Sequence, residues 1–383
     1  MITSDILSPD ALTDEHKQCW ASWQRSNPEL TSPFFDFRFF QAAARTVPGA
    51  RVAMFHDRGR PVAFLPFQRR GQLIQPLGAP LCDYHGLIAA PETSVDLKQM
   101  LRRAHAGVMR FGSWVGPVQN AVPVAMHERL AILMPDGFAP WLAGQHKRHH
   151  KFYKNLGRCE RGAERDLGPL RLVMDANCSS DRNWIIAQKQ AQYRRTRRHD
   201  VFQCGWTGAL LDQLSLGASP EFGLRTFVLY AGETRLAAEM VLQNGREVHR
   251  WFPAYDPQYH RYSPGVLLLS AMLKHLETEG VTHVDFGSGD EPYKRYMADP
   301  VGVVHEGRAE TCLLHLAVSH GLDWLETRVP QQQARVLAFR NSLRRRVDVI
   351  SGCETRLDGW VRASAVAALG LAGKFSTLSH PTG

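Results

Sequence analysis

The 383-residue sequence has no apolar run of the roughly 18 to 20 residues that a membrane-spanning helix requires. Its N-terminus, MITSDILSPDALTDEH, has neither a basic start nor an apolar core, so we expect no secretory signal peptide there. The seven cysteines are scattered and form no CxxC pair, which argues against a disulfide framework and against a zinc site. These absences predict a cytoplasmic protein without a metal.

Positive charge is in excess, with a formal net charge of +9. Much of it lies in three blocks, HKRHHKFYKNLGR (146–158), YRRTRRH (193–199) and FRNSLRRR (339–346). Clustered lysine and arginine indicate a phosphate-bearing partner, such as a coenzyme, a sugar nucleotide, a lipid phosphate or RNA. Each block taken alone is also typical of the solvated face of a helix.

The first half of the chain has the pattern of a mixed α/β fold. SPFFDFRFFQAAART (32–46) begins with Ser-Pro and continues with apolar periodicity, which predicts a helix. RVAMFHD (51–57) and RPVAFLPFQRR (60–70) are strand-like and are joined by the hairpin signal Arg58-Gly59. A further helix is predicted at 95–107.

The second half repeats this plan. The expected elements are a basic helix around 146–165, a strand at 170–175, a helix at 181–198, three strands within 224–257, a helix at 263–280, a strand at 282–287 and a short helix after it. A helix between two strands favours a right-handed crossover, which makes those strands parallel. We therefore predict an α/β (α+β) fold of two tandem modules with mixed sheets, residues 1–160 and 161–316, and a helical tail, residues 317–383.

The loop QYHRYSPGV (258–266) lies between a predicted strand and a predicted helix. A helix N-terminus binds phosphate because its first N–H groups are unpaired and its dipole end is positive. The N–H groups of Ser263, Gly265 and Val266 would be presented there, with Arg261 just before them. The layout resembles the loop with which GNAT acyltransferases hold the pyrophosphate of acyl-coenzyme A, although this loop has a single glycine.

The motifs around this loop extend the resemblance. WFPAYDPQYHRYSPGVLLL followed by DFGSGDEPYKRYM, with SPFFDFRFFQAAA, RPVAFLPFQRR and PLGAPLCDYHGLIA earlier in the chain, resembles the CelD/BcsL type of GNAT acetyltransferase. That family is associated with cellulose and other exopolysaccharide synthesis and is related to the Fem-type peptidyltransferases, which carry two GNAT modules. The resemblance covers about residues 30–310.

The resemblance implies a reaction and its participants. It implies transfer of an acyl group from acetyl-CoA or another acyl-CoA, without a metal, to a nitrogen of a sugar-nucleotide or lipid-linked saccharide. It also implies a cytoplasmic protein, with peripheral association with membrane-bound polysaccharide synthesis machinery at the inner membrane as an alternative.

The segment DFGSGDEPYKRYM (285–297) is the first candidate for catalysis. In Fem-type enzymes an aromatic–lysine pair lies near the transferring group, and Tyr293-Lys294 occupies the matching place. A fixed ammonium can hold the oxyanion of acyl transfer, so Lys294 is our candidate for that role. Glu291 and Asp290 would hold Lys294 or contact the acceptor. The alternative is that these charges only cap a surface helix.

Attack by an amine requires a general base within hydrogen-bond reach. Asp83 and His85 in LCDYHG are candidates, because the resemblance places this stretch at the cleft between the modules. His249, on a predicted strand facing the same region, is a third candidate. A lone histidine on a strand is more often a packed core residue.

Four further residues are candidates for substrate contacts. Trp251 and Tyr255 suit stacking on a sugar ring, although aromatic residues in strands more often belong to the core. Arg194 and Arg195 could clamp a diphosphate through bidentate hydrogen bonds.

Two other functions remain open from the sequence. A Fem-type transferase would use aminoacyl-tRNA, and the basic segment 146–158 would then contact RNA; otherwise we expect no nucleic acid partner. A catalytically degenerate module could instead bind a nucleotide, and Arg340 and Arg344 resemble half of a cyclic-dinucleotide motif. In the tail, the small-residue segment 356–373 either lies on a membrane surface or packs on the body.

Overall fold

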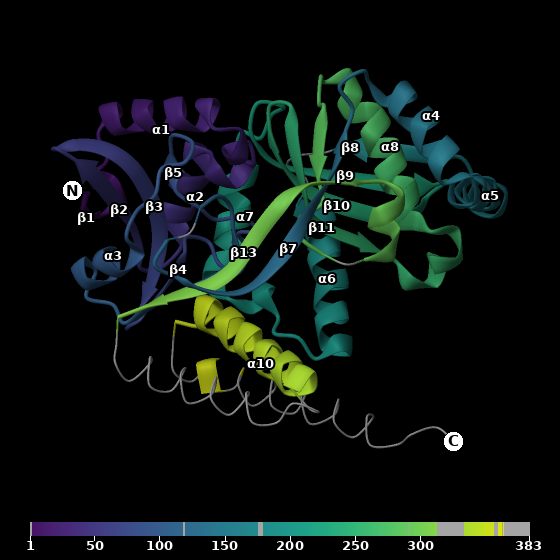
Figure 1. The fold of residues 1–383 in the computed structure, drawn as a ribbon. Helices are drawn as coiled ribbons and strands as arrows, with labels where there is room; N and C mark the ends of the chain where they lie inside the picture. Colours follow the sequence, from purple (N-terminus) through teal and green to yellow (C-terminus); the bar gives the residue numbers. More distant parts are fainter. Residues whose placement is uncertain are drawn as a thin grey trace.

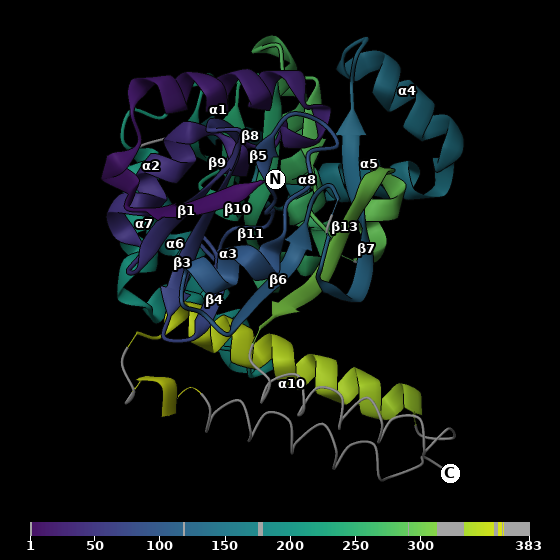
Figure 2. The same ribbon diagram turned by 60° about the vertical axis from the view of Figure 1, so that its left-hand side comes forward.

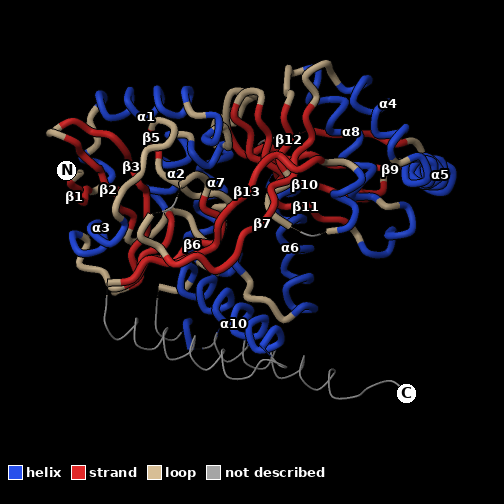
Figure 3. The backbone as a smooth tube through the Cα atoms, viewed as in Figure 1, coloured by secondary structure: helices blue, strands red, loops and turns tan. Residues whose placement is uncertain are grey.

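The computed structural model describes residues 2–117, 119–174, 179–289, 291–311, 333–355, 359–361 and 363. Among these residues, thirteen strands form one sheet in the order β1-β2-β3-β4-β6-β13-β7-β12-β11-β10-β9-β8, with β5 paired to β3 at the side. The strands follow one another across the whole molecule in Figure 3. The sheet is mixed and helices pack against it, so the predicted fold class is confirmed.

The N-terminal half-sheet starts with four antiparallel strands. These are β1 (Thr3–Leu7), β2 (Ala50–Asp57), β3 (Arg60–Arg70) and β4 (Leu73–Pro76). Helix α3 (Leu97–Arg103) then leads to β6 (Val108–Trp114), which is parallel to β4. The short β5 (Ile88–Ala89) pairs with β3.

The C-terminal half-sheet has the same order of elements. The four antiparallel strands are β8 (Leu170–Met174), β9 (Gly223–Ala231), β10 (Thr234–Asn244) and β11 (Glu247–Tyr255). Helix α8 (Pro264–Thr278) leads to β12 (His283–Asp285), which is parallel to β11 as predicted. The doubled plan inferred from the sequence is therefore present in the strand order.

The two half-sheets exchange their last strands. β7 (Val122–Leu133) follows β6 in the chain but pairs with β12, whereas β13 (Asp299–Glu310) follows β12 but pairs with β6. The two exchanged strands also pair with each other and cross the middle of the molecule (Figure 1). The expected boundary after residue 160 falls inside α5 (His150–Leu167), and the division of the chain into these modules stays a prediction.

Two predicted helices are each divided in two. The 32–46 segment becomes a 3₁₀ turn and α2, because Asp36 is extended and its carboxylate caps α2 by accepting from the N–H of Arg38. The basic 146–165 segment is divided at His149, whose φ of −130° and ψ of 43° are not helical. The remaining helices are α1 (Asp14–Ser26), α2 (Phe37–Thr46), α4 (Phe138–Arg148), α6 (Ser179–Thr196), α7 (Gly205–Ser215) and α10 (Gln333–Cys353).

Short 3₁₀ helices connect these elements. They are η1 (Pro9–Ala11), η2 (Pro28–Leu30), η3 (Pro33–Phe35), η4 (Val201–Gln203), η5 (Pro257–Tyr262) and η6 (Pro292–Tyr296). The short helix predicted after β12 is thus the 3₁₀ helix η6. Five of the six begin with proline, whose fixed φ suits the first position of a helix.

Buried apolar residues join the two halves into one core. One cluster runs from Trp20 and Phe34 through α7 to Met240 and Trp251, so it includes side chains from both half-sheets. A second lies beneath α5 and α8, and a third beneath α3. The shared cluster fixes the N-terminal half against β10 and β11, which positions the site described below.

Helix α10 packs on the body along the lower side of both views (Figure 1, Figure 2). Gln75 Nε2 donates to the Asp348 carbonyl at 2.8 Å, and Arg110 pairs with the Asp348 carboxylate at 2.8 Å. Most of the predicted tail, including nearly all of 356–373, lies outside the described residues. Among the described helices, none combines the length and hydropathy that crossing a bilayer requires.

Candidate active site

Strands β11 and β12 pair over only a short length before they diverge. The parallel register joins Glu247–His249 to His283–Asp285 and extends no further. Beyond it, Phe286 N–H donates to the Leu130 carbonyl of β7 at 2.9 Å, so the chain turns toward β7 and away from β11. The edge of β11 after His249 is therefore unpaired with β12, and an unpaired strand edge can accept an extended ligand.

The start of α8 lies in the loop that follows β11. Ser263 has a left-handed φ of 50°, which is strained for a residue with a side chain, and its side chain does not cap the helix. Its N–H donates to His260 O at 3.0 Å, and the N–H of Val266 donates to Ser263 O at 3.0 Å. Of the three N–H groups predicted for phosphate, only that of Gly265 has no partner within the described chain. The Arg261 side chain is mostly exposed and lies near Asp166.

A carboxylate–histidine–carboxylate array, consisting of Asp83, His249 and Asp285, lies where the halves meet. His249 Nε2 is 2.8 Å from the Asp83 carboxylate, and its Nδ1 is 3.4 Å from the Asp285 carboxylate. The His249 side chain is 0% exposed, whereas that of Asp83 is 43% exposed. The array therefore connects a buried carboxylate, through a buried imidazole, to a carboxylate that reaches solvent.

The buried end of the array is strongly held. Asp285 accepts from the Tyr84 hydroxyl at 2.7 Å and from the Gly287 N–H at 2.6 Å, and it pairs with Arg129 at 3.3 Å. Burial alone would raise the pKa of Asp285, but His249, Arg129 and the Tyr84 hydroxyl outweigh burial and lower it. Asp285 is therefore a carboxylate throughout the physiological range.

The charge of His249 follows from its two neighbours. Burial alone would lower the pKa of this imidazole, but the carboxylates of Asp285 and Asp83 outweigh burial and raise the pKa to about 9. His249 is thus an imidazolium at neutral pH and does not act as the free base. Asp83 is the member of the array that solvent and a ligand can reach.

Two predicted site residues have other functions in the fold. His85 Nε2 accepts from the N–H groups of Gly112 at 3.3 Å and Ser113 at 3.1 Å, and burial lowers the pKa of His85 to about 3. His85 is therefore a neutral acceptor that ties its loop to β6. The Trp251 indole donates to the Leu81 carbonyl at 2.8 Å and is 7% exposed, so it belongs to the core and cannot stack on a ligand. Tyr255 is 46% exposed and remains a candidate for stacking on a ligand.

A second group of charges lies beside the divergence of β11 and β12. Arg250 makes a bidentate ion pair with Glu239 at 2.8 and 2.7 Å, and both side chains are buried. Arg250 also donates to the Tyr293 hydroxyl at 3.2 Å and lies over the Phe286 ring at 4.6 Å. Burial would lower the pKa of Arg250, but Glu239 outweighs burial and raises it. Arg250 therefore connects β11 to the turn that carries the predicted catalytic lysine.

Lys294 is buried within this turn and does not extend into solvent. Its Nζ donates to the Phe286 carbonyl at 3.0 Å and pairs with Glu291 at 2.8 Å. A Cβ at Gly289 would lie 2.7 Å from Nζ and 2.6 Å from the Glu291 carboxylate, so a larger residue at 289 would displace the ends of these two side chains. Glu291 is within reach, as predicted, and Asp290 lies outside the described residues.

Helix α6 supplies a face that the sequence analysis missed. Arg194 and Arg195, the predicted diphosphate clamp, are exposed, whereas Lys189 and Tyr193 are half-buried. Burial lowers the pKa of Lys189 to about 8, and its charged neighbours include Glu239, Arg250 and Glu291. Asp83 is among the charges that act on Tyr193. Because α6 packs on β10 and β11, this helical face adjoins both charge groups. Lys189 and Tyr193 are four residues apart, so they lie on one face of a helix, and this spacing was the signal that the sequence offered.

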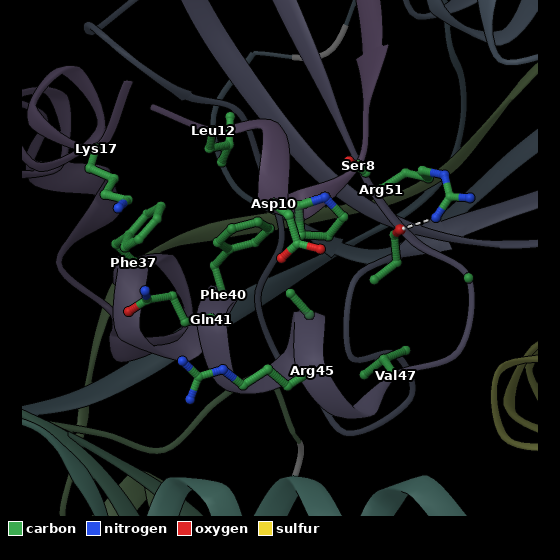
Figure 4. Close-up of a pocket in the computed structure, with 14 residues that line it drawn as sticks. Ser8, Asp10, Leu12, Lys17, Phe37, Phe40, Gln41, Arg45, Val47 and Arg51 are labelled. Atoms are coloured by element: carbon green, nitrogen blue, oxygen red, sulfur yellow. Dashed lines mark hydrogen bonds between the residues drawn. The ribbon is translucent and has the colours of Figure 1, made fainter. Parts of the chain in front are cut away.

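Of two large cavities, one is lined by a residue that contacts the carboxylate–histidine array and the other is not. A cavity of 640 Å³ in the N-terminal half is lined by Asp10, Lys17, Arg45 and other residues of that half, and no predicted site residue lines it (Figure 4). A cavity of 590 Å³ is lined by residues that include Glu29, Arg129 and His283. The second cavity therefore reaches the buried end of the array through Arg129.

Comparisons with known proteins give one family match and several structures with a similar fold. Residues 150–295 match the family model of the acetyltransferase (GNAT) domain. A tandem GNAT protein from the clavulanic acid biosynthesis pathway is 12% identical, with a TM-score of 0.47 over 81% of this chain and 98% of that one. FemX is 10% identical, with a TM-score of 0.49 over 76% of this chain and 95% of that one. No curated protein matches. The match of residues 150–295 to the GNAT model supports an enzyme of the acyltransferase type.

Proposed function

We propose that the protein transfers an acyl group, in the first instance acetyl, from acyl-CoA to an amino group of a sugar or lipid-linked saccharide. The setting would be exopolysaccharide or cell-envelope polysaccharide synthesis, as the CelD/BcsL resemblance implies. The observation that carries the proposal is the Asp83–His249–Asp285 array beside the divergence of β11 and β12. It supports transfer to an amine because the Asp83 carboxylate, held by the buried His249 imidazolium, lies next to the edge of β11 that a coenzyme could use.

The coenzyme would use the unpaired edge of β11 and the start of α8. Amide groups of its pantetheine arm can pair with a strand edge as an added strand does. The free N–H of Gly265 and the positive end of α8 suit a phosphate group, with the mostly exposed Arg261 nearby as a counter-charge. When bound, acyl-CoA supplies an activated thioester.

The residues of the chain would then guide the amine and the charge that develops. Asp83 accepts a hydrogen bond from the acceptor nitrogen and takes its proton as the new carbon–nitrogen bond forms, because the nitrogen becomes more acidic during attack. The imidazolium of His249 fixes the carboxylate in place. Lys294 places a positive charge at the β12 turn, where it can stabilise the oxyanion. The thiolate of coenzyme A leaves and is protonated.

The test is Asp83→Asn, which keeps the shape of the side chain and removes its charge. We expect the kcat/KM for the amino acceptor to fall by about 10²- to 10⁴-fold, the range for loss of a positioned base, with the KM for acetyl-CoA unchanged. Release of free coenzyme A would be followed with a panel of 2-amino sugars and lipid-linked amino sugars. Asp136→Asn, at an exposed site, is the matched control. Activity of Asp83→Asn within a few-fold of wild type would refute the assignment.

The donor is tested separately. Acetyl-CoA should raise the melting temperature of the wild-type protein, because a ligand that binds only the folded state stabilises it. Salt-sensitive binding of tRNA without any response to acetyl-CoA would instead favour the aminoacyl-tRNA alternative.

A further inference from the structure

Three potential metal ligands from distant parts of the chain meet on the side of the molecule where α10 packs. His199 follows α6, Cys204 directly precedes α7, and Cys353 is the last residue of α10. The imidazole nitrogen and the two sulfur atoms all lie within 4.8 Å of one another. Both cysteines are free thiols. Neither the sheet nor the acyl-transfer groups described above involve these side chains.

The distance between one sulfur and the imidazole nitrogen is that of a tetrahedral zinc site. With Zn–S of about 2.3 Å and Zn–N of about 2.0–2.1 Å, the sulfur–nitrogen edge of a tetrahedron is about 3.6 Å. The distance from Cys204 Sγ to His199 Nε2 is 3.6 Å. An oxygen ligand at about 2.0–2.2 Å gives a nitrogen–oxygen edge of about 3.4 Å. Glu354 Oε1 lies 3.5 Å from the same nitrogen but is not within 4.8 Å of all three ligand atoms, so its carboxylate would shift to become a fourth ligand.

The surroundings are those of a closed structural site. Cys204 is 5% exposed and Cys353 is 2% exposed. The Trp206 indole donates to the Cys353 carbonyl at 3.2 Å, and Gln68 Nε2 donates to the Gly352 carbonyl at 3.4 Å. The backbone that carries Cys353 is therefore fixed by hydrogen bonds from both halves of the protein, independently of any metal.

We propose that His199, Cys204 and Cys353 bind a zinc ion, with Glu354 completing the site. Two thiolates and an imidazole form a donor set typical of zinc. The ion would attach the end of α10 to the segment between α6 and α7. Because the same α6 carries Lys189 and Tyr193 toward the acyl-transfer groups, this attachment would stabilise the helix that borders the active site.

The site runs against the expectation of a metal-free protein drawn from the cysteine spacing. That expectation considered only ligands close together in sequence, such as CxxC. Here two ligands are five residues apart and the third comes from a helix near the C-terminus, so only the fold brings them together.

Metal analysis of the full chain purified without chelators tests the proposal. We expect about one zinc per chain in the wild type, and loss of most of it in Cys204→Ser and in Cys353→Ser. Cys19→Ser is the control, because Cys19 is a free thiol outside the cluster. Substitution with cobalt should give the visible bands of a tetrahedral ion together with thiolate-to-cobalt charge transfer.

A readout on the unaltered protein guards against variants that fail to fold. A mercurial reagent that blocks thiols should release zinc from the wild type in step with modification, and a chelator should lower its melting temperature. Wild-type protein that contains no zinc and gives no tetrahedral cobalt spectrum would overturn the proposal. So would a Cys204–Cys353 disulfide as the main species in a non-reduced peptide map.

Discussion

The charge of His249 makes stability depend on pH in a defined direction. Its pKa is raised from 6.5 to about 9 in the folded protein, because the carboxylates of Asp285 and Asp83 outweigh the effect of burial. A group that binds its proton more tightly when folded adds stability that is complete below the unfolded pKa and is lost as pH rises through the folded pKa. The pKa difference between 6.5 and about 9 corresponds to about 3 kcal/mol.

The perturbation that isolates this effect is His249→Gln. Glutamine keeps a hydrogen-bonding side chain but cannot be charged, so the variant should be less stable than wild type at pH 6.5. Between pH 6.5 and about 9 the difference in free energy of unfolding should shrink by about 3 kcal/mol. The quantity to follow is the free energy of unfolding of wild type minus that of His249→Gln at each pH. Burial lowers the pKa of Lys189 to about 8, and this lysine changes stability in the opposite direction as pH rises in both proteins, so the subtraction removes its effect.

The assay is denaturant unfolding at a series of pH values, with the slope m compared between the proteins. His150→Gln, at an exposed position, is the control and should follow the wild-type curve. A difference between wild type and His249→Gln that stays constant within about 0.5 kcal/mol across this range would refute the reasoning, because it would mean that His249 is neutral when folded.

Three further predictions concern the second group of charges. Glu239→Gln should destabilise the protein by about 3–5 kcal/mol in denaturant unfolding, because it leaves Arg250 buried without its partner, whereas the double variant Glu239→Leu with Arg250→Met should recover much of that loss. Lys294→Ala should lower turnover by about 10²-fold in steady-state kinetics, and Lys294→Arg should recover part of the loss. Rates within a few-fold of wild type would mean that this lysine only stabilises the turn. Gly289→Ala should lower kcat with little change in the KM for acetyl-CoA, because its Cβ would lie 2.7 Å from Lys294 Nζ.

Much of the fold could be predicted because local patterns determine it. The hairpin of β2 and β3 follows from two alternating runs around Arg58-Gly59, and α8 follows from Pro264 at its first turn and Gly280 after its end. The parallel pairing of β11 and β12 follows from the handedness of the crossover between them. These features need no knowledge of distant segments.

The features that could not be predicted depend on contacts between distant segments. The exchange of β7 and β13 has no local signature, because the strand with which each one pairs lies far away in the sequence. Trp251 was a candidate for stacking on a sugar ring, with the core as the alternative, and its indole donates to a carbonyl from the other half of the molecule. Lys189 was overlooked beside a conspicuous run of arginines, since only packing shows which face of α6 is covered.

The basic block at 339–346 also shows what the sequence alone could not predict. The pair Arg340 and Arg344 was considered as half of a cyclic-dinucleotide motif. Arg344 instead forms an ion pair with Glu306 of β13, and the side chain of Arg340 lies outside the described residues. A positive run in sequence therefore does not show how much positive charge is available to a ligand, because here a buried acid neutralises part of it.

The strand exchange bears directly on where the chemistry can occur. The GNAT match covers 150–295 and includes His249 and Asp285, but it excludes Asp83, Tyr84 and Arg129. Asp83 and Tyr84 come from the N-terminal half, and Arg129 lies on the exchanged strand β7. Without them, His249 would lose its exposed carboxylate and Asp285 would lose two of its partners while remaining buried, which is costly for a charge. The second module alone therefore cannot form the array, and the N-terminal half contributes to the proposed active site as well as repeating the order of elements.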